Sequence, residues 1–291
     1  MTHWEQIAEA IGQATGENFV IEQQRSVGGG CINHAAVIEG NGLRFFVKLN
    51  RAQARAMFEA ECAGLDELRK ADAIRVPRPI CTGVAGGESF LAMEYLDLSG
   101  RVDGARAGCQ LAELHRVTAE QFGWTRDNTI GATPQINTPY RDWASFWREC
   151  RLGPQLRLAA ANGYGGRLQQ TGERLMESLT ALLDHRPAPS LLHGDLWGGN
   201  IGATPSAEPV IFDPAVYYGD READLAMTEL FGGFDARFYA AYRESWSLDP
   251  GYGVRKTLYN LYHILNHLNL FGGGYLLQAQ SMIERLLAEL S

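Results

Sequence analysis

The stretch HGDLWGGNIGATPSAEPVIFDPA, residues 193–215, places three polar side chains of interest in one glycine-rich segment. Asp195 and Asn200 are five residues apart, and Asp213 follows at the end of the apolar run PVIF. Glycine, aspartate and asparagine are also ordinary turn residues, so a structural turn is the plainer interpretation. The alternative is a catalytic loop followed by a short strand that ends on a metal ligand.

The spacing of these residues suits phosphoryl transfer. Two short strands joined by a turn near residues 206–208 would bring Asp213 back beside Asn200. Their side-chain oxygens suit Mg²⁺, which takes few protein ligands and keeps water and phosphate oxygens at its other positions. Asp195 then remains as a base that could orient a hydroxyl group. The reaction needs little else, because it depends mainly on held phosphates, a bridging metal and an aligned nucleophile.

Outward from this stretch, the sequence pattern divides the chain in two. Residues 18–50 predict a three-stranded antiparallel meander with an Asn-Gly hairpin turn. Residues 52–70 predict a helix, and residues 76–96 predict a second hairpin that turns at two glycines. The rest of the chain is mainly helical. We therefore expect an α+β fold, with a small β-rich lobe containing one helix over residues 1–97 and a larger, mainly helical lobe over residues 98–291.

Two charged residues of the first lobe occupy apolar positions. Glu61 shares one helical face with Phe58, Leu65 and Leu68, where an unpaired carboxylate would be costly. Lys48 lies inside the apolar strand LRFFVKLN, where an unpaired ammonium group would also be costly. A single ion pair between the two side chains would satisfy both. The alternative is that Lys48 reaches solvent at the strand end and Glu61 lies at the edge of the apolar face.

Residues 27–33, VGGGCIN, form a glycine-rich turn between two predicted strands. That position excludes a Rossmann motif, which needs a strand followed by a helix, and the chain contains no GxxxxGK[ST] sequence. Backbone N–H groups in such a turn can approach phosphates, although a tight structural turn fits equally well. Cys31 lies within the turn, and a reactive thiol there would block nucleotide binding when oxidised. The plainer alternative is that Cys31 is a small strand residue.

Composition excludes several classes of protein. The net charge of −8 argues against nucleic acid or an anionic membrane as a partner. The five cysteines are scattered without a CxxC pair, which argues against a disulfide framework or a zinc site and for a reducing compartment. The sequence shows no signal peptide and no apolar run of about 18–20 residues. We therefore expect a cytoplasmic protein with no nucleic-acid or membrane partner, and the sequence makes no prediction of oligomeric state.

The order of the features resembles the protein-kinase signature set: a glycine-rich hairpin, a strand lysine, a helix glutamate, D-x4-N and a strand-end aspartate. H-G-D replaces H-R-D and D-P-A replaces D-F-G, which resembles kinases of small molecules such as the aminoglycoside and choline kinases. Longer blocks resemble the fructosamine kinase (ketosamine 3-kinase) family from about Trp4 to Leu290. The blocks are HGDLWGGN, FDPAVYYGDREADLAMTELFGGF, MFEAECAGL and FGWTRDNTIGATPQINTPYRDWASFWRECRLGPQL.

The resemblance implies a bilobal protein-kinase-like fold and an ATP- and Mg²⁺-dependent kinase that phosphorylates the 3-hydroxyl of a ketosamine. The acceptor would be a fructosamine or ribulosamine, carried by a small amine or by a lysine of a glycated protein, and the role would be deglycation. Asp195 would be the catalytic base, with Asn200 and Asp213 as Mg²⁺ ligands. The nucleotide would contact Gly28, Gly29, Gly30, Lys48, Glu61 and the inter-lobe hinge of Met93, Glu94, Tyr95 and Leu96. The acceptor would contact Trp197, Tyr217, Tyr218, Asp220 and Glu222.

Other functions fit parts of this pattern. The acceptor could be another small hydroxylated molecule, such as an aminoglycoside or choline. A non-catalytic nucleotide-binding protein usually lacks one of the lysine, aspartate or asparagine positions, all of which are present here. A metallophosphoesterase needs an upstream D-x-H sequence and several metal histidines, and the chain contains no D-x-H.

Some single residues have more than one interpretation. Trp197 could pack beneath the loop instead of facing a sugar. Asp224 could cap a helix or anchor the backbone of the catalytic loop. His193 is expected to shape the loop by hydrogen bonding. His263 and His267 lie one helical turn apart, and we expect them to be packed residues rather than a metal pair, because no third ligand is visible nearby.

Overall fold

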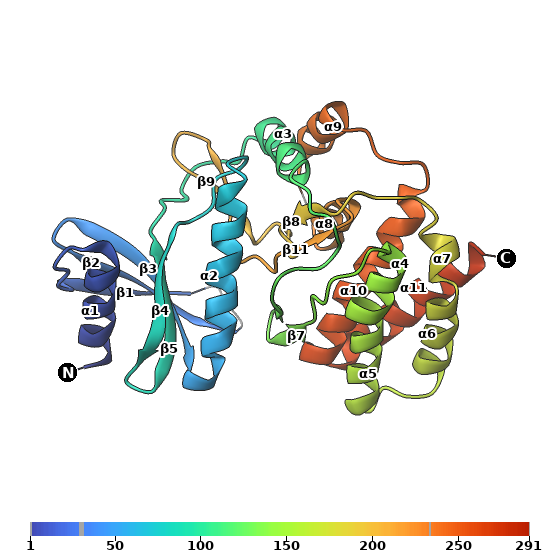
Figure 1. Ribbon diagram of the computed structural model, residues 1–291, viewed down its shortest axis with the longest axis horizontal. Helices are drawn as coiled ribbons and strands as arrows, with labels where there is room; N and C mark the ends of the chain where they lie inside the picture. Colours follow the sequence, from blue (N-terminus) through green and yellow to red (C-terminus); the bar gives the residue numbers. More distant parts are fainter. Residues whose placement is uncertain (1, 29–31, 233, 291) are drawn as a thin grey trace. The chain divides into compact units, whose positions relative to one another are not determined.

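The computed structural model describes residues 2–28, 32–232 and 234–290 (Figure 1). The chain forms two compact units. Unit 1 comprises Met1–Val102 and Gly202–Pro214, and unit 2 comprises Asp103–Ile201 and Ala215–Ser291. The chain therefore returns to unit 1 for one short segment that ends just after Asp213. The functional division into residues 1–97 and 98–291 stays a prediction.

Unit 1 is built on a five-stranded antiparallel sheet in the order β1-β2-β3-β5-β4. The strands are β1 (Gln23–Val27), β2 (His34–Gly40), β3 (Leu43–Arg51), β4 (Pro79–Ala85) and β5 (Glu88–Glu94). Asn41 and Gly42 have φ values of 52° and 75°, which a tight hairpin turn requires. Gly86 and Gly87 have φ values of 57° and 86°. The predicted meander and the second hairpin are therefore confirmed.

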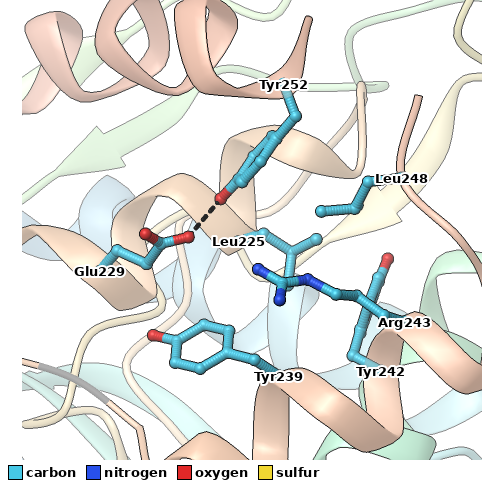
Figure 2. A pocket seen from close by; sticks show the side chains of 7 residues that line it. All are labelled: Leu225, Glu229, Tyr239, Tyr242, Arg243, Leu248 and Tyr252. Atoms are coloured by element: carbon cyan, nitrogen blue, oxygen red, sulfur yellow. Dashed lines mark hydrogen bonds between the residues drawn. The ribbon is translucent and has the colours of Figure 1, made fainter. Parts of the chain in front are cut away.

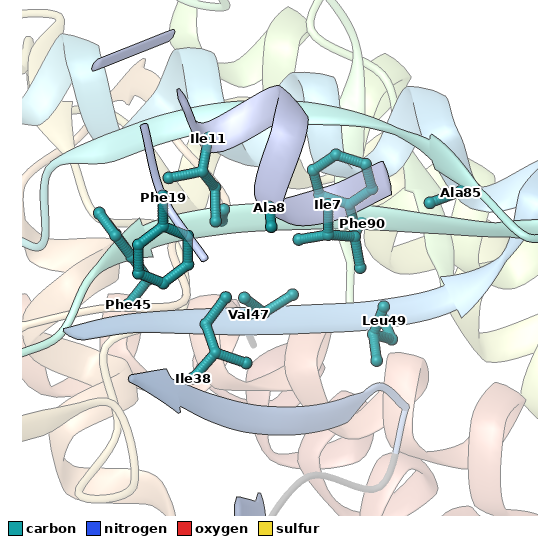
Figure 3. Close-up of a cluster of buried hydrophobic side chains, with 11 residues drawn as sticks. Ile7, Ala8, Ile11, Phe19, Ile38, Phe45, Val47, Leu49, Ala85 and Phe90 are labelled. Atoms are coloured by element: carbon teal, nitrogen blue, oxygen red, sulfur yellow. The ribbon is translucent and has the colours of Figure 1, made fainter. Parts of the chain in front are cut away.

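Helices cover both faces of this sheet (Figure 1). α1 (His3–Thr15) packs on one face, and α2 (Arg55–Lys70), which follows the short 3-10 turn η1 (Ala52–Ala54), packs on the other. The α1 side holds a buried apolar cluster, shown in Figure 3, of Ile7, Ala8, Ile11, Phe19, Ile38, Phe45, Val47, Leu49, Ala85, Phe90 and Ala92. Because strand side chains alternate, Phe45, Val47 and Leu49 point toward α1, and Lys48 points toward α2.

Unit 2 is mainly helical. Its longer helices are α3 (Gly104–His115), α5 (Gly153–Ala161), α6 (Arg167–Glu177), α8 (Glu222–Leu230), α9 (Ala236–Ser245), α10 (Tyr252–Phe271) and α11 (Leu276–Ala288). Its shorter ones are α4 (Trp143–Trp147), the π-helical turn η2 (Arg148–Leu152), α7 (Leu179–Leu182) and the 3-10 turn η3 (Gly273–Tyr275). Two small antiparallel sheets pair β6 (Asn128–Ile130) with β7 (Thr133–Gln135) and β8 (Ser190–Leu192) with β11 (Tyr217–Gly219).

A further strand pair lies where the chain re-enters unit 1. β9 (Ile201–Ala203) pairs with β10 (Pro209–Ile211), and the turn between them is closed by a hydrogen bond from Thr204 N to Glu208 O of 3.0 Å. This pair forms the two short strands that the sequence predicts on either side of a turn near residues 206–208. Asp213 follows two residues after β10, as the sequence predicted.

α10 forms the centre of unit 2 and packs against α5, α8 and α11. Leu258, Leu261, Leu265 and Leu268, spaced three or four residues apart on one face of the helix, are all at most 1% exposed. The helix is buried on more than that face, because Tyr259 is also fully covered. Among the described residues, no helix combines the length and apolar character needed to cross a membrane. The α+β class, with one β-rich and one mainly helical unit, is confirmed.

Candidate active site

Asp224 holds the loop that carries Asp195. Asp224 Oδ2 accepts a hydrogen bond from His193 N at 2.7 Å, and Asp224 Oδ1 accepts one from Gly194 N at 2.8 Å. Gly194 has a φ of 83°, and a Cβ there would lie 2.1 Å from Ala215 O, so only glycine fits. The loop therefore leaves β8 through a fixed turn immediately before Asp195. The interpretation of Asp224 as a loop anchor is confirmed.

Two further buried groups brace Asp224. His115 Nε2 lies 3.2 Å from Asp224 Oδ2, and His115 Nδ1 lies 2.8 Å from Tyr242 OH. Burial alone would raise the pKa of Asp224, but hydrogen bonds and positive charge from His115 and the Gly194 N–H outweigh it and lower that pKa. Asp224 is therefore an anion within the first turn of α8, where the helix dipole favours negative charge, and it is not the helix N-cap.

Asp195 and Asn200 face each other within the loop. Asn200 Nδ2 donates to Asp195 O at 2.9 Å and to Asp195 Oδ2 at 3.3 Å, and Asn200 N donates to Trp197 O at 2.9 Å. Both side-chain hydrogen bonds that Asn200 makes to Asp195 use its amide nitrogen, and the role of Asn200 as a metal ligand stays a prediction. His193 is fully buried and its Nδ1 accepts a hydrogen bond from Asp195 N at 3.3 Å. The expectation that His193 shapes the loop is confirmed.

Lys48 lies between two carboxylates within unit 1. Lys48 Nζ donates to Glu61 Oε1 at 2.5 Å and also donates to Asp213 Oδ1. The side chains of Lys48 and Glu61 are 7% and 11% exposed, so the predicted pairing of two buried charges is confirmed. Burial alone would lower the pKa of Lys48, but the carboxylates of Asp213 and Glu61 outweigh it and raise that pKa. Lys48 is therefore a permanent cation in the working pH range.

Asp213 combines an unusual backbone with an accessible side chain. Its φ is 58°, in the left-handed region, which costs a non-glycine residue roughly 1–2 kcal/mol and tends to occur at functional sites. Its side chain is 46% exposed, so a cation can reach the carboxylate that also contacts Lys48. Carboxylate and amide oxygens, such as those of Asp213 and Asn200, are donors that suit Mg²⁺.

The glycine-rich turn is described only in part. A methyl group added at Gly28 would meet no atom within 4 Å, so the space beside this residue is open. Gly29, Gly30 and Cys31 lie outside the described residues, and the oxidation hypothesis for Cys31 lies outside them as well.

The predicted hinge residues continue from the end of β5. Met93 is buried, whereas Glu94, Tyr95 and Leu96 are half-buried. The guanidinium of Arg44 lies 4.8 Å from the centroid of the Tyr95 ring, a cation–π distance. The side chain of Glu94 is engaged with Arg75 and with the N–H of Arg78, so it is not free to contact a nucleotide, and the hinge role of this segment stays a prediction.

Trp197 and Tyr218 are the predicted acceptor residues with accessible side chains. Trp197 is 39% exposed, and its role as an acceptor residue stays a prediction. Its indole lies against the loop backbone, since a Cβ at Gly199 would meet the ring at 2.3 Å. Tyr218 is half-buried, and its N–H donates to Gly123 O at 2.8 Å while its carbonyl accepts from Gly123 N at 2.9 Å. This backbone pairing fixes the strand on which Tyr218 lies.

The other predicted acceptor residues are buried and already paired. Asp220, 2% exposed, lies 2.6 Å from His185 Nε2 and accepts a hydrogen bond from Tyr259 OH. Glu222, 1% exposed, accepts two hydrogen bonds from Arg255, at 2.7 and 3.0 Å. His185, Asp220 and Glu222 offer ligand atoms within 4.8 Å of one another, but the Arg255 cation already occupies Glu222. The contacts therefore describe an ion-pair network that holds the start of α8.

Tyr217 is also buried, beneath a cation that sequence reasoning did not assign. The guanidinium of Arg151 lies 4.0 Å from the Tyr217 ring centroid, and it donates to Ile136 O at 2.6 Å. Arg151 is fully buried in the π-helical turn η2, a feature common near functional sites. Nearby, Gln135 Nε2 donates to Ala215 O at 3.1 Å. These residues fix the backbone that follows Asp213, while the predicted acceptor roles of Tyr217, Asp220 and Glu222 stay predictions.

A shallow hollow, with no enclosed space for a water molecule, lies between α8, α9 and the start of α10 (Figure 2). It is lined by Leu225, Glu229, Tyr239, Tyr242, Arg243, Leu248 and Tyr252. Glu229 is already engaged, because Tyr252 OH donates to it at 2.7 Å and Lys256 Nζ at 2.6 Å. None of the lining residues is one that the sequence predicted for the site, although Tyr242 also contacts His115.

His263 and His267 are packed residues, as expected. His267 Nδ1 donates to His263 O at 2.8 Å, which closes a helical turn and does not point toward a shared ion. His263 is 5% exposed, and burial lowers its pKa to about 3. This histidine is therefore neutral in the folded chain.

His263 makes the stability of the chain depend on pH. An unfolded histidine titrates near pH 6.5, so as the pH falls the unfolded state takes up a proton that the folded state refuses. The contribution of His263 is full above that pH and shrinks as the pH falls toward 3, by about 2 kcal/mol between pH 6.5 and 5. Urea unfolding at pH 7.5 and at pH 5 measures the free energy of unfolding. Between these two pH values that free energy should fall less for His263→Gln than for wild type. The exposed His34 provides the control, and an equal loss in His263→Gln and His34→Gln would contradict a neutral His263.

The known sequences that resemble this chain carry the names of sugar-amine kinases. The family model of fructosamine kinase matches residues 3–289. The chain is 50% identical to a "probable ketoamine kinase" of Synechocystis sp., over 98% of this chain and 97% of that protein. It is 46% identical to the chloroplastic protein-ribulosamine 3-kinase of Arabidopsis thaliana, over 89% of this chain and 81% of that protein.

Comparison with solved structures agrees. A "putative fructosamine-3-kinase" from Haemophilus somnus superimposes with a TM-score of 0.90 at 30% identity, covering 98% of this chain and 97% of that one. A second, from Thermobifida fusca, has a TM-score of 0.85 at 32% identity and covers 97% and 98%. An aminoglycoside phosphotransferase has a TM-score of 0.61 at 13% identity, over 98% and 99%, which shows a shared fold alone.

Proposed function

The chain belongs to the fructosamine kinase family, and we propose that it transfers the γ-phosphate of ATP to the 3-hydroxyl of a ketosamine. It has the protein-kinase-like fold of the aminoglycoside phosphotransferases. The observation that carries the proposal is the cluster in which Lys48 contacts both Glu61 and Asp213. In a phosphotransferase, a buried cation binds the phosphates of the nucleotide, and an accessible carboxylate beside it binds the metal ion.

In this proposal the residues of unit 1 hold the nucleotide. Lys48, kept in place by Glu61, binds the α- and β-phosphates, and the turn of Gly28, Gly29 and Gly30 covers them. The segment Met93–Leu96 receives the adenine through its main chain. Asp213 and Asn200 hold Mg²⁺, which when bound neutralises charge on the phosphate oxygens.

The residues of the loop after β8 act on the acceptor. Asp195 accepts a hydrogen bond from the 3-hydroxyl and takes its proton as the phosphoryl group transfers. The anchor at Asp224 keeps that carboxylate in one orientation, so the hydroxyl is aligned before reaction. Trp197 presents the face of its indole to the sugar or to its attached amine.

The acceptor is proposed to be a fructosamine or ribulosamine, on a free amine or on a lysine of a glycated protein. Phosphorylation at the 3-position makes the adduct labile, so the enzyme would serve deglycation. A cytoplasmic site of action is part of the same proposal and rests on the spacing of the five cysteines, which are scattered along the sequence without a CxxC pair.

A substrate panel tests the proposed function directly. The protein is mixed with MgATP and, in separate reactions, a ribulosamine, a fructosamine, an erythrulosamine, an aminoglycoside and choline. We expect ADP release only with ketosamines, together with a product that carries phosphate on the 3-oxygen by phosphorus NMR. Release with the aminoglycoside or choline and with no ketosamine would assign a different acceptor class to the same fold.

Lys48→Met tests the role of the cation. The variant leaves Glu61 buried without its partner, so we expect the free energy of unfolding to fall by about 3 kcal/mol. We also expect kcat/KM for ATP to fall by about a hundredfold or more, because a charged contact to the phosphates is lost. Urea unfolding and ADP release measure the two effects. Glu61→Gln is the matched variant and should lose less of both, since Lys48 keeps its contact with Asp213. Normal ATP turnover in Lys48→Met would contradict the phosphate-binding role.

A further inference from the structure

The segment between α2 and β4 joins two functional parts of unit 1. The backbone of Arg75 pairs in parallel with Val210 of β10, and Arg75 O accepts a hydrogen bond from Ile211 N at 3.0 Å. The side chain of the same residue reaches the other way, where Arg75 Nη2 lies 2.5 Å from Glu94 Oε1. One residue therefore contacts both the strand that leads to Asp213 and the predicted hinge.

Glu94 is held on this segment by more than the ion pair. Its second carboxylate oxygen, Oε2, accepts from Arg78 N at 3.1 Å. Its own N–H donates to Arg78 O at 2.8 Å. Three hydrogen bonds thus fasten the end of β5 to residues 75–78, and the side chain of Glu94 is not available to a nucleotide.

On the other side of Arg75, the path from β10 to Asp213 is also short. Val210 and Ile211 are fully buried, and only Phe212 separates Ile211 from Asp213. Asp213 in turn contacts Lys48. A path of direct contacts therefore runs from Glu94 through Arg75 and β10 to the residue proposed to hold Mg²⁺.

We propose that Arg75 is a positioning residue, which sets the spacing between the adenine-binding segment Met93–Leu96 and the metal ligand Asp213. The inference rests on the proposed function, in which the adenine lies at Met93–Leu96 and the metal-bound phosphates lie at Asp213. Arg75 itself would contact neither the adenine nor the phosphates. A fixed spacing lowers the cost of binding a ligand that must engage both ends at once, and it offers nothing to a ligand that engages one end.

Stability alone would not reveal this role. The side chains of Arg75 and Glu94 are 40% and 28% exposed, and ion pairs with that exposure contribute little to the free energy of unfolding. The informative quantity is the affinity for MgATP relative to the affinity for adenosine, which lacks the phosphates and the metal. Coupling through such contacts changes an affinity by severalfold to tens of fold.

The test uses Arg75→Met, which keeps the backbone hydrogen bond to Ile211 and removes the guanidinium. Dissociation constants for MgATP and adenosine are measured by titration calorimetry on the full chain, with thermal unfolding in parallel. We expect MgATP affinity to fall about tenfold while adenosine affinity and Tm stay near wild type. Arg75→Lys, which keeps a cation, should recover part of the loss. Arg55→Met is the control, because it removes an exposed arginine ion-paired with Glu59 on α2.

The outcomes separate this inference from the proposed function. Wild-type protein that fails to bind MgATP would overturn the proposed function and this inference with it. Wild-type binding together with unchanged MgATP affinity in Arg75→Met would overturn the positioning role alone. Equal losses for MgATP and adenosine would also overturn it, because they would mean that Arg75 only maintains the hinge.

Discussion

Replacing Asp195 by Asn is expected to lower kcat about a thousandfold, because an amide of the same shape cannot take the proton of the acceptor hydroxyl. The affinity for MgATP should stay close to that of wild type, since the cluster of Lys48, Glu61 and Asp213 is unchanged. ADP release with a saturating ketosamine measures the first quantity, and titration calorimetry with MgATP measures the second. A fall in kcat with intact nucleotide binding is the signature of a lost base.

The control for Asp195→Asn must remove a carboxylate elsewhere in unit 2. Asp184 is exposed and lies at no predicted site, so Asp184→Asn should turn over as wild type does. Near-normal turnover of Asp195→Asn beside an active wild type would remove Asp195 as the base, and Asp224, already bound to two backbone N–H groups, could not replace it.

The pairing of Lys48 with Glu61 could be predicted because it solves a local conflict. Strand and helix periodicity place each charge among apolar side chains, and the two residues are thirteen positions apart in neighbouring elements. Periodicity therefore predicts both that Lys48 and Glu61 are buried and that they pair with each other. It did not reveal that Asp213, 165 positions away, shares the same lysine, because nothing in a local pattern records so distant a contact.

The same limit applies to the burial of two of the predicted acceptor residues. Asp220 and Glu222 lie close to Asp213 in sequence, and the family resemblance implies that they contact the acceptor. The turn from β11 into α8 carries them into the interior, where Glu222 meets Arg255 of α10. Sequence shows that a carboxylate follows a strand, but the direction of its side chain depends on the packing of a helix far along the chain.

The loop anchor was predicted only as one of two possibilities. Asp224 opens an apolar helix, and that pattern is typical of both a cap and a buried anchor. The groups that decide the matter are His115, 109 positions away, and Tyr242, which lies 127 positions from His115. His115 is fully buried, and its packing serves the catalytic loop through its contact with Asp224.

Asp224→Ala is expected to cause the largest loss of stability among single substitutions at the site. The variant leaves His193 N and Gly194 N buried without an acceptor, at about 1–3 kcal/mol for each group, so the free energy of unfolding should fall by about 4 kcal/mol. Asp224→Asn keeps one oxygen acceptor and should lose less. Tyr242→Phe removes the hydroxyl that contacts His115 Nδ1 and accepts from Arg221 Nη1, and should lose about 1–2 kcal/mol. Urea unfolding of the three variants checks this ranking.

The pH dependence of that loss identifies the charge state of Asp224. Because its pKa is lower in the folded chain than in the unfolded chain, its ionisation stabilises the fold above about pH 4 and ceases to do so as the pH falls through the folded pKa. The difference in unfolding free energy between wild type and Asp224→Asn should therefore shrink on acidification. A difference that stays constant would mean that the carboxyl group acts only by its shape.

Activity should fall further in Asp224→Asn than its stability explains. The two N–H groups that Asp224 binds belong to the residues directly before Asp195, so a weaker anchor lets the base leave its aligned position. At a temperature where the variant is fully folded, we expect kcat to fall at least about tenfold, since small displacements of a reacting group are costly, while MgATP affinity is unchanged. ADP release and calorimetry give the comparison. Loss of nucleotide affinity in step with kcat would show that Asp224 supports the whole of unit 2, and a normal kcat would show that the loop holds Asp195 without its anchor.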